Sequence, residues 1–459
     1  MIRVSGPASE AALRALIPGK LPGDRVATLR NITHPTSGET LDRGLVVRFV
    51  APRSFTGEDM VELQITGGRA VINAVLGALA TIPGLRPAEP GEFAWRAFEN
   101  GKIDLSQVEG LADLIDAQTE AQRRQALRIA GGALSRQTET IRARLVQAMA
   151  LIEAQIDFSD QEDVDSLSLA QVRRLMEEAA NAITATLATA HSGELLREGF
   201  VVVIAGAPNA GTSTLMNALA RRDVSIVSAL PGTTRDAIEV HLDLRGYPVS
   251  LVDTAGLRDT SDPIETEGIS RAKKRIEAAD LTLWLTDEGT EATAVPTPTG
   301  PMLVVRTKID LEATRAEGAL RPLAGEGVRR SPQDGGGRRR ALGEEHARPS
   351  PLPQAGDGEV ISLSAKTGAG IPDLLDAIAA RAEAQFSGQG PALITLERHR
   401  LAFAEALQRL DACLARSDGA LELIAEDLRR AARALERIAG RVDVEEVLGE
   451  IFSRLCIGK

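Results

Sequence analysis

The spacing of hydrophobic and polar residues changes at three points along the chain, and each change marks a different kind of structure. Before the first change, short β-rich runs at Gly44 to Val50 and Met60 to Ile65 alternate with turns rich in glycine and proline. A helical period runs from about Val71 to Ala80. The pattern therefore predicts a small α+β domain over residues 1–98.

From Ser106 to about Thr189 the pattern is that of long amphipathic helices. Ile141, Leu145, Ala148 and Ile152 recur at positions i, i+4, i+7 and i+11, which places them on one helix face. No strand-like run interrupts this stretch, so we predict an all-α domain that begins with residues 99–197.

At Phe200 short apolar strands begin to alternate with helical stretches, which is typical of a mainly parallel α/β sheet over residues 198–384. The predicted strands are Phe200 to Ala205, Val249 to Val252, Leu281 to Leu285, Met302 to Val305 and Val360 to Leu363. From about Pro391 the helical period resumes, and its apolar stripe consists of Val444, Val447, Leu448, Ile451 and Leu455. Helices on both sides of an α/β module are most simply one helical domain, residues 99–197 and 385–459, into which that module is inserted.

Residues 312–359 are rich in proline, glycine and arginine and poor in apolar residues. We interpret them as a disordered surface loop inserted in the α/β domain. A tolerated insertion is the simpler interpretation, because the closure entropy of a surface loop grows slowly with length. The alternative is a basic segment that binds RNA.

Composition narrows the classes of function. The chain has 53 basic and 64 acidic residues among 459, a net charge of −11, so no overall basic field attracts nucleic acid. Its apolar runs are too short to span a membrane, and Met1 to Ile17 lacks the features of a signal peptide, so we expect a cytoplasmic protein. Cys413 and Cys456 are its two cysteines, too few for a disulfide framework, and Cys413 lies in an amphipathic pattern that predicts a core position.

A glycine-rich turn between a strand and a helix predicts a phosphate-binding loop. After the strand that ends at Ala205 comes Gly206-Ala207-Pro208-Asn209-Ala210-Gly211-Thr212-Ser213, and a helical stretch follows from Thr214 to Arg221. Backbone N–H groups and the helix N-terminus would face the phosphates. The usual lysine of this pattern is replaced by Thr212, whereas Ser213 keeps the hydroxyl that binds Mg²⁺.

Three more elements at strand ends predict a GTPase of the type related to translation factors. Thr254-Ala255-Gly256 follows Asp253, a carboxylate suited to Mg²⁺. Thr307-Lys308-Ile309-Asp310 places a carboxylate for the guanine edge, and Ser364-Ala365-Lys366 resembles the loop beside guanine O6. The predicted GTP-binding residues are Asn209, Ala210, Gly211, Thr212, Ser213, Thr214, Ser228, Ala229, Leu230, Pro231, Gly232, Thr233, Thr234, Asp253, Thr254, Ala255, Gly256, Thr307, Lys308, Ile309, Asp310, Ser364, Ala365 and Lys366.

The residue that orients the attacking water is not decided by this pattern. Leu257 follows Gly256 where a glutamine would serve, and four acids lie downstream: Asp259, Asp262, Glu265 and Glu267.

Four stretches make the chain resemble the MnmE (TrmE) family of tRNA modification GTPases along nearly its whole length. They are Ser54-Phe55-Thr56-Gly57-Glu58-Asp59, Leu195-Leu196-Arg197-Glu198-Gly199, the Pro208-Asn209-Ala210-Gly211 loop and the C-terminal Cys456-Ile457-Gly458-Lys459. The resemblance implies an N-terminal domain that dimerises and binds 5-formyl- or 5,10-methylene-tetrahydrofolate, a helical domain and an inserted Ras-like P-loop GTPase domain. It also implies a heterotetramer with a flavin-dependent MnmG-type partner, and tRNA would bind mostly through that partner. Together the two proteins would add an aminomethyl or carboxymethylaminomethyl group at C5 of the wobble uridine.

The resemblance also implies roles for single residues. Glu265 is the catalytic acid by position, so the resemblance selects among the four acids. Ser213 and Thr234 would bind Mg²⁺, and the K⁺ ligands would be Asn209, Ser228, Leu230 and Thr233. The folate residues would be Arg3, Glu62, Lys102 and Lys459. Cys456 is either a nucleophile or a positioning residue, since an unperturbed thiol is mostly protonated at neutral pH.

Three departures from the family pattern change the expectations. The chain begins later than family members do, which suggests a shortened N-terminal domain. Thr307 stands where asparagine is usual in the guanine motif, a change that should preserve specificity. Thr212 removes a positive charge from the phosphates, so we expect reduced GTP affinity and turnover unless K⁺ and Mg²⁺ compensate. A hydrolysis-deficient scaffold of the same complex is the alternative, and a ribosome-assembly GTPase fits the G domain but not the Cys456 tail.

Overall fold

The structure is a computed structural model of residues 1–459. It describes residues 1–157, 165–206, 209–222, 225–226, 239–253, 279–286, 300–311, 360–386, 392–416 and 420–441. The chain divides into two compact units, Met1–Arg197 with Phe386–Lys459, and Glu198–Gln385. Each unit is described by itself.

The first unit begins with a small α+β domain, as the hydrophobic pattern predicted. Its elements are β1 (Ile2–Ser5), α1 (Ser9–Leu16), β2 (Thr28–Thr33), β3 (Thr40–Phe49), β4 (Met60–Gln64), α2 (Arg69–Ala80) and α3 (Glu92–Glu99). The four strands form an antiparallel sheet in the order β1-β4-β3-β2. Alternate residues such as Val46 and Leu63 pack with Leu13 of α1 and Val75 of α2, so the helices cover one sheet face. The other sheet face carries Leu29 and Leu45, which are paired across β2 and β3.

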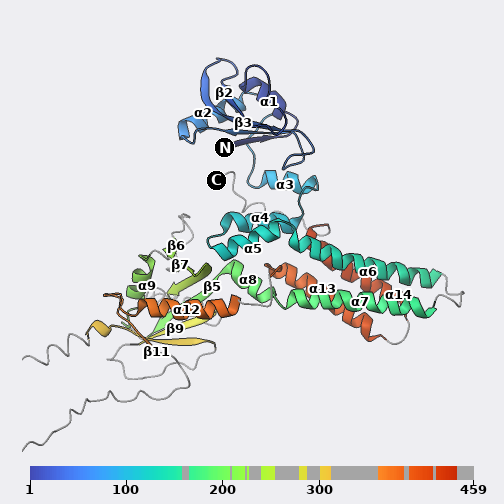
Figure 1. The fold of residues 1–459 in the computed structure, drawn as a ribbon, viewed down its shortest axis with the longest axis vertical. Helices are drawn as coiled ribbons and strands as arrows, with labels where there is room; N and C mark the ends of the chain where they lie inside the picture. The colour runs from blue at the N-terminus through green and yellow to red at the C-terminus, as the bar shows by residue number, and fades with distance from the viewer. Residues whose placement is uncertain are drawn as a thin grey trace, which may run out of the picture. The chain divides into compact units, whose positions relative to one another are not determined.

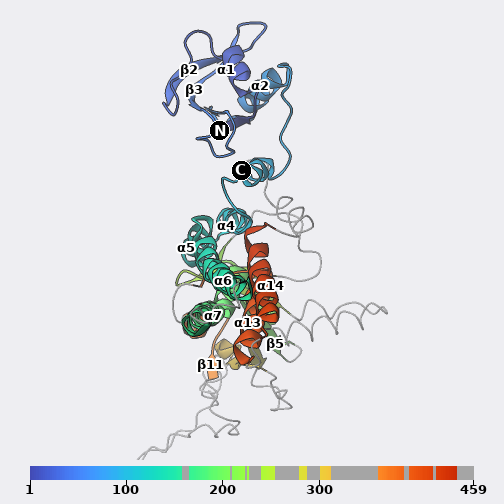
Figure 2. The same cartoon turned by 90° about the vertical axis from the view of Figure 1, so that its right-hand side faces the viewer.

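Among the residues that the structure describes, seven helices follow in the same unit, four of them in a bundle. They are α4 (Leu105–Asp116), α5 (Glu120–Ala130), α6 (Ala133–Asp157), α7 (Asp165–Leu187), α8 (Ala190–Glu198), α13 (Glu397–Ala415) and α14 (Leu421–Ala439). The bundle is formed by α6, α7, α13 and α14, which pack side by side although they come from opposite ends of the sequence (Figures 1 and 2). Helices from before and after residues 198–385 therefore share one core.

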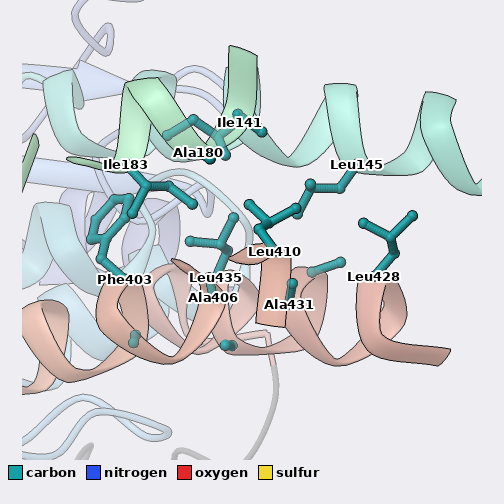
Figure 3. Close-up of a cluster of buried hydrophobic side chains, with 14 of the residues drawn as sticks. Ile141, Leu145, Ala180, Ile183, Phe403, Ala406, Leu410, Leu428, Ala431 and Leu435 are labelled. Atoms are coloured by element: carbon teal, nitrogen blue, oxygen red, sulfur yellow. The ribbon is translucent and has the colours of Figure 1, made fainter. Parts of the chain in front are cut away.

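The bundle core consists of the apolar stripe that the sequence predicted and its partners from α7, α13 and α14. Ile141, Leu145, Ala148 and Ile152 are all 0% exposed. Figure 3 shows Ile141 and Leu145 facing residues such as Leu410 and Leu435 of the returning helices. Each large aliphatic side chain buried in this way stabilises the fold by about 1.5–3 kcal/mol before the cost of ordering it. Cys413 is 2% exposed in the same core, which confirms its predicted position.

The chain leaves and re-enters the helical body at neighbouring points. A Cβ atom on Gly193 of α8 would lie 2.0 Å from the carbonyl oxygen of Ile394, just before α13. Only glycine allows this close approach.

The second unit is an α/β arrangement built around a seven-stranded sheet. Its elements are β5 (Phe200–Gly206), α9 (Thr212–Ala220), β6 (Ser225–Ile226), β7 (Glu239–Leu244), β8 (Tyr247–Asp253), β9 (Leu281–Thr286), β10 (Met302–Arg306), β11 (Val360–Ser362) and α12 (Ile371–Phe386). The strand order is β11-β10-β9-β5-β8-β7-β6, parallel from β11 to β8 and antiparallel at β7 and β6. The mainly parallel sheet is as predicted, and the predicted strands differ from the observed ones by one or two residues at their ends. The helix after the glycine-rich loop begins at Thr212 and not at Thr214.

Several predictions fall outside the described residues: the insertion at 312–359, the apolar stripe from Val444 to Leu455 and the Cys456 tail. Within the described part of the chain, no helix is both long enough and apolar enough to cross a bilayer.

Candidate nucleotide site and the outer face of the N-terminal sheet

The glycine-rich loop leaves the central strand of the sheet. β5 lies between β9 and β8, and its last residue, Gly206, has no room for a side chain because a Cβ atom would lie 2.6 Å from the Leu285 carbonyl oxygen. Asn209 and Gly211 have φ angles of 65° and 95°, the left-handed conformation that turns the chain into α9. The free N–H groups at the start of α9 therefore lie at the carboxyl edge of the sheet, where an anion is stabilised.

The first turn of α9 carries the substitution at the lysine position. Thr212 is the first helical residue and is buried, with 9% of its surface exposed, and Thr214 is exposed. The hydroxyl of Thr212 supplies no positive charge, and the described part of the loop contains no basic residue. A phosphate bound at this loop would therefore depend on backbone N–H groups and on cations.

Next to Thr212, Ser213 meets a buried carboxylate. Asp253, the last residue of β8, is 0% exposed, and the Ser213 hydroxyl donates a 3.3 Å hydrogen bond to its Oδ2. A hydroxyl and a single carboxylate are the oxygen donors that fit Mg²⁺, which takes its other ligands from phosphate and water. Ser213 and Asp253 could therefore hold that ion beside a bound triphosphate. In the described residues no group of three or more His, Cys, Asp or Glu gathers as an all-protein metal cage.

The ends of β10 and β11 form the second half of the site. Ser364 Oγ donates a 2.7 Å hydrogen bond to Asp310 Oδ1, and Leu363 N–H donates to the Arg306 carbonyl at 2.8 Å. Lys308 takes a left-handed φ of 62°, which turns the chain between the strand and Asp310. The oriented carboxylate of Asp310 can accept two hydrogen bonds from a planar ligand edge. Ala365 and the exposed Lys366 lie in the turn that follows Ser364.

Thr307 links the two halves of the site, a contact that the sequence did not predict. Its hydroxyl donates a 2.7 Å hydrogen bond to the carbonyl oxygen of Ala210 in the glycine-rich loop. Its own N–H donates to the Thr286 carbonyl at 2.8 Å. The contact follows from the strand order, which places the end of β10 two strands from β5, and nothing in the sequence around Thr307 indicated it.

The remaining residues predicted for the nucleotide site lie outside the described residues. These are Ser228, Ala229, Leu230, Pro231, Gly232, Thr233, Thr234, Thr254, Ala255, Gly256 and Glu265. Of the residues expected at the K⁺ site, the structure describes Asn209, which is exposed.

A second cluster lies on the face of the N-terminal sheet that α1 and α2 leave uncovered. Arg3 and Glu62 are register partners on β1 and β4, and Arg3 Nη2 lies 2.6 Å from Glu62 Oε1. The guanidinium carbon of Arg3 is 5.6 Å from the ring centroids of both Phe55 and Phe93. A planar cation that contacts two aromatic rings and is paired with a carboxylate suits a flat, polar ligand.

Lys102 joins this cluster through the loop that carries Phe55. Its Nζ donates a 2.9 Å hydrogen bond to the Pro52 carbonyl, and its stem would touch a Cβ atom on Gly57 at 3.3 Å. Asn100 donates to the Thr56 carbonyl at 2.8 Å, which fixes the loop against the turn before α4. The structure thus brings Arg3 and Glu62 together and places Lys102 against the loop that carries Phe55, whereas Lys459 lies outside the described residues.

A hydrogen-bonded network supports the loop from behind, and the sequence did not indicate it. Ser5 Oγ lies 2.6 Å from Thr56 Oγ1, and Arg96 of α3 binds both Glu58, at 3.0 Å, and Glu92, at 2.8 Å. Burial would raise the pKa of Glu92, but hydrogen bonds from Arg86, the Glu89 N–H and Arg96 outweigh it and lower the pKa to about 2.

Two family models match the chain, one on each side of residue 103. The model described as the GTP-binding protein TrmE N-terminus matches residues 1–102, and the model of the MnmE helical domain matches residues 105–456. The first match covers the N-terminal α+β domain. The second covers the helical part of the first unit and also spans the inserted α/β unit.

Relatives match along the full chain. It is 49% identical over 462 residues to a tRNA modification GTPase MnmE from Methylobacterium radiotolerans, covering 100% of this chain and 96% of that protein. It is 47% identical over 459 residues to the protein of the same name from Azorhizobium caulinodans, covering 100% and 95%.

Among solved structures, the similarities are more distant. The G domain of the FeoB iron transporter of T. maritima is 20% identical, covers 40% of this chain and 98% of its own, and has a TM-score of 0.25. Era from Aquifex aeolicus, bound to GDP and AlF4−, is 22% identical over 48% of this chain and 69% of its own, with a TM-score of 0.24.

Proposed function

Because the chain belongs to the MnmE family of tRNA modification GTPases, we propose that it is a K⁺-dependent GTP hydrolase that works on the wobble uridine of certain tRNAs. With a flavin-dependent MnmG-type partner it adds an aminomethyl or carboxymethylaminomethyl group at C5. The one-carbon unit comes from 5-formyl- or 5,10-methylene-tetrahydrofolate. The reaction takes place in the cytoplasm, and tRNA binds mostly through the partner, since the net charge of this chain is −11.

The observation that carries the GTPase proposal is the convergence of two polar pairs at one edge of the sheet. Ser213 with Asp253 suits Mg²⁺ and phosphate, and Asp310 with Ser364 suits the N1 and N2 donors of guanine. Thr307 holds the two halves in one geometry through Ala210. Adenine lacks that pair of donors, so the site favours GTP over ATP.

The residues predicted for the site, described or not, each have a task in this proposal. The N–H groups at the start of α9 bind the phosphates, and Ser213 and Asp253 hold Mg²⁺, which neutralises charge that develops on them. Thr234 completes the Mg²⁺ shell, and Asn209, Ser228, Leu230 and Thr233 hold K⁺ near the phosphates. Glu265 orients the attacking water.

The folate proposal is supported by the cluster on the uncovered sheet face. Glu62 can accept from the amino group and ring N–H of a pterin, and its ion-pair partner Arg3 lies against the rings of Phe55 and Phe93. Arg3, Lys102 and Lys459 offer positive charge to the glutamate tail. Cys456 is the nucleophile or positioning residue near the end of the chain.

The homodimer proposal is supported by an apolar pair on the same uncovered face. Leu29 and Leu45 are register partners, and they are 48% and 40% exposed. Two exposed leucines side by side on a sheet are suited to a second copy of the domain.

Thr212 gives a second candidate function specific support. A hydroxyl in place of the lysine charge weakens phosphate binding, so the chain could serve as a nucleotide-binding scaffold that turns over slowly. The experiment that separates the two is mass spectrometry of wobble uridines from cells that lack this gene. Complementation is done with this chain and with Thr212→Lys. Rescue by both supports the GTPase, and rescue by the lysine variant alone supports the scaffold. Rescue by neither contradicts both versions of the tRNA-modification proposal for this chain.

A further inference from the structure

Two acidic residues of α4, one helical turn apart, bind the chain on both sides of the inserted α/β unit. Asp113 accepts a 2.8 Å hydrogen bond from Arg197 Nε, one residue before that unit begins. Glu109 binds Arg398 and His399, at the start of α13, after the chain returns. We call Glu109, Asp113, Arg197, Arg398 and His399 the α4 junction.

The Glu109 half of the α4 junction is deeply buried. Glu109 and His399 have side chains 5% and 0% exposed. Arg398 Nε donates to Glu109 Oε1 at 2.5 Å, Arg398 Nη2 binds Oε2, and His399 Nε2 lies 2.9 Å from Oε2. Burial lowers the pKa of His399, so the ring is neutral and donates from Nε2, because a carboxylate can only accept. Among the described residues its Nδ1 has no hydrogen-bond partner.

The Asp113 half holds the end of α8. The backbone of Arg197 is bound as well as its side chain, because Gln122 Nε2 of α5 donates a 3.2 Å hydrogen bond to the Arg197 carbonyl. Arg400 Nε of α13 lies 3.0 Å from Glu194 Oε1 of α8, so the outgoing and returning segments also bind each other.

Arg398 extends the α4 junction to a third segment. Its Nη1 and Nη2 donate to the carbonyl oxygens of Arg437 at 3.1 Å and Ile438 at 3.3 Å, in the last turn of α14. Carbonyls in the last turn lack the usual i+4 partner, and although the Gly440 N–H also donates to the Arg437 carbonyl at 3.3 Å, the guanidinium serves as an additional C-terminal cap. From here the chain continues toward Cys456.

Stability alone is a poor explanation for this arrangement. Bringing an ion pair into the interior costs solvation energy that the attraction often does not offset, and apolar residues of the same size commonly serve as well. The neighbouring bundle is held by apolar side chains. A buried pair does fix one specific arrangement of the segments it binds, because any other leaves a charge without its partner.

We propose that the α4 junction makes the end of α8, the start of α13 and the end of α14 one cooperative unit. Through it, the nucleotide state of the inserted G domain changes the environment of the segment that carries Cys456. This inference rests on the proposed GTPase function, and Glu109 is its positioning residue.

Cooperativity is tested by hydrogen–deuterium exchange on the full-length protein, with Glu109→Gln and a control, Glu153→Gln. Glu153 also joins two helices, through a 2.8 Å ion pair with Arg429, but far along the chain from both connections. The expected result is that Glu109→Gln raises amide exchange by about tenfold in residues 190–197, 392–400 and 435–441 together, the effect of a buried charge that loses its partner. Glu153→Gln should leave all three segments unchanged. Faster exchange in 392–400 alone would overturn the proposal.

Communication with the tail is tested by the rate at which iodoacetamide modifies Cys456, with and without saturating GDP. Cys413 should not react with iodoacetamide in this assay, because burial raises the pKa of its thiol to about 11. GDP should change the Cys456 rate in the unsubstituted protein and not in Glu109→Gln, although both bind GDP equally in a direct titration. An unchanged GDP effect in Glu109→Gln would overturn the proposal, as would no GDP effect in unsubstituted protein that binds GDP. Failure of that protein to bind GDP would contradict the GTPase proposal, and the exchange experiment would then decide on the cooperative unit.

Discussion

The hydroxyl of Thr307 donates a 2.7 Å hydrogen bond to the carbonyl oxygen of Ala210, 97 residues earlier in the chain. In the proposed nucleotide site, this bond would join the guanine end to the phosphate end. In Thr307→Val the shape is kept, but the buried carbonyl loses this partner. We expect nucleotide binding to weaken by about 1–2 kcal/mol. Titration with a fluorescent GDP analogue measures this, and Thr307→Ser, which keeps the hydroxyl, should bind as the unsubstituted protein does. Equal affinity for the valine variant would contradict the role of Thr307.

Thr212 should limit both affinity and turnover. In Thr212→Lys an ammonium group would reach the phosphates, and a charge-assisted hydrogen bond contributes about 1.5–3 kcal/mol, or roughly 10- to 150-fold. Steady-state GTP hydrolysis in K⁺ and Mg²⁺ measures the gain. Thr214→Lys is the control, because Thr214 is exposed on the same helix. If the two variants hydrolyse GTP at the same rate, the position of the charge has no importance.

Asp310 should determine the choice of base. In Asp310→Asn one of the two acceptor oxygens becomes an NH2 donor, which repels the N2 donor of guanine but can donate to the C2 oxygen of xanthine. We expect GTP affinity to fall by at least about tenfold and xanthosine triphosphate affinity to rise. Competition binding with both nucleotides checks the exchange, and a parallel loss of both would indicate a folding defect instead.

The uncovered sheet face should carry the dimer contact. Leu45→Lys places a charge beside Leu29, and burying an unpaired charge at an interface is unfavourable by several kcal/mol. Light scattering after size-exclusion chromatography should show monomers at micromolar concentration. Leu76→Lys is the matched control, since Leu76 is 48% exposed on α2, which covers the other sheet face. Monomers from both variants, or from neither, would argue against this face.

Acid should destabilise the loop beside Arg3 through Glu92. The pKa of Glu92 falls from 4.5 to about 2 on folding, so its stabilising effect is complete above pH 4.5 and is lost as pH falls toward 2. Glu92→Gln should therefore lose less thermal stability between pH 5 and pH 3 than the unsubstituted protein does. Calorimetry at both pH values measures this. Glu99→Gln, at an exposed position on the same helix, should behave as the unsubstituted protein, and identical acid sensitivity in Glu92→Gln would refute the assignment.

Periodicity predicted the elements that are long or strongly patterned. The stripe from Ile141 to Ile152 is buried as expected, and β5, β9 and β10 lie where apolar runs placed them. Strand ends were less certain, because Gly206, Thr286 and Arg306 continue strands although they are not typical apolar strand residues. Local pattern does not carry information about where a strand stops when a neighbouring strand supplies its hydrogen bonds.

Polar contacts between residues far apart in the chain could not be predicted from the sequence. Thr307 was expected only as a tolerated replacement, and its bond to Ala210 depends on the order of strands in the sheet. Glu109 and Arg398 are 289 residues apart, and nothing in the spacing of charges predicts that they meet. Such contacts follow from the packing of whole elements, which a single sequence does not specify.

The approach of Gly193 to Ile394 has a consequence for protein engineering. Because the two connections meet, a short peptide between them could replace residues 198–385 without moving any helix of the bundle. The helical body should therefore tolerate a foreign domain inserted between these two fixed positions. Exchange of the inserted domain between distant relatives becomes a practical way to make chimaeras.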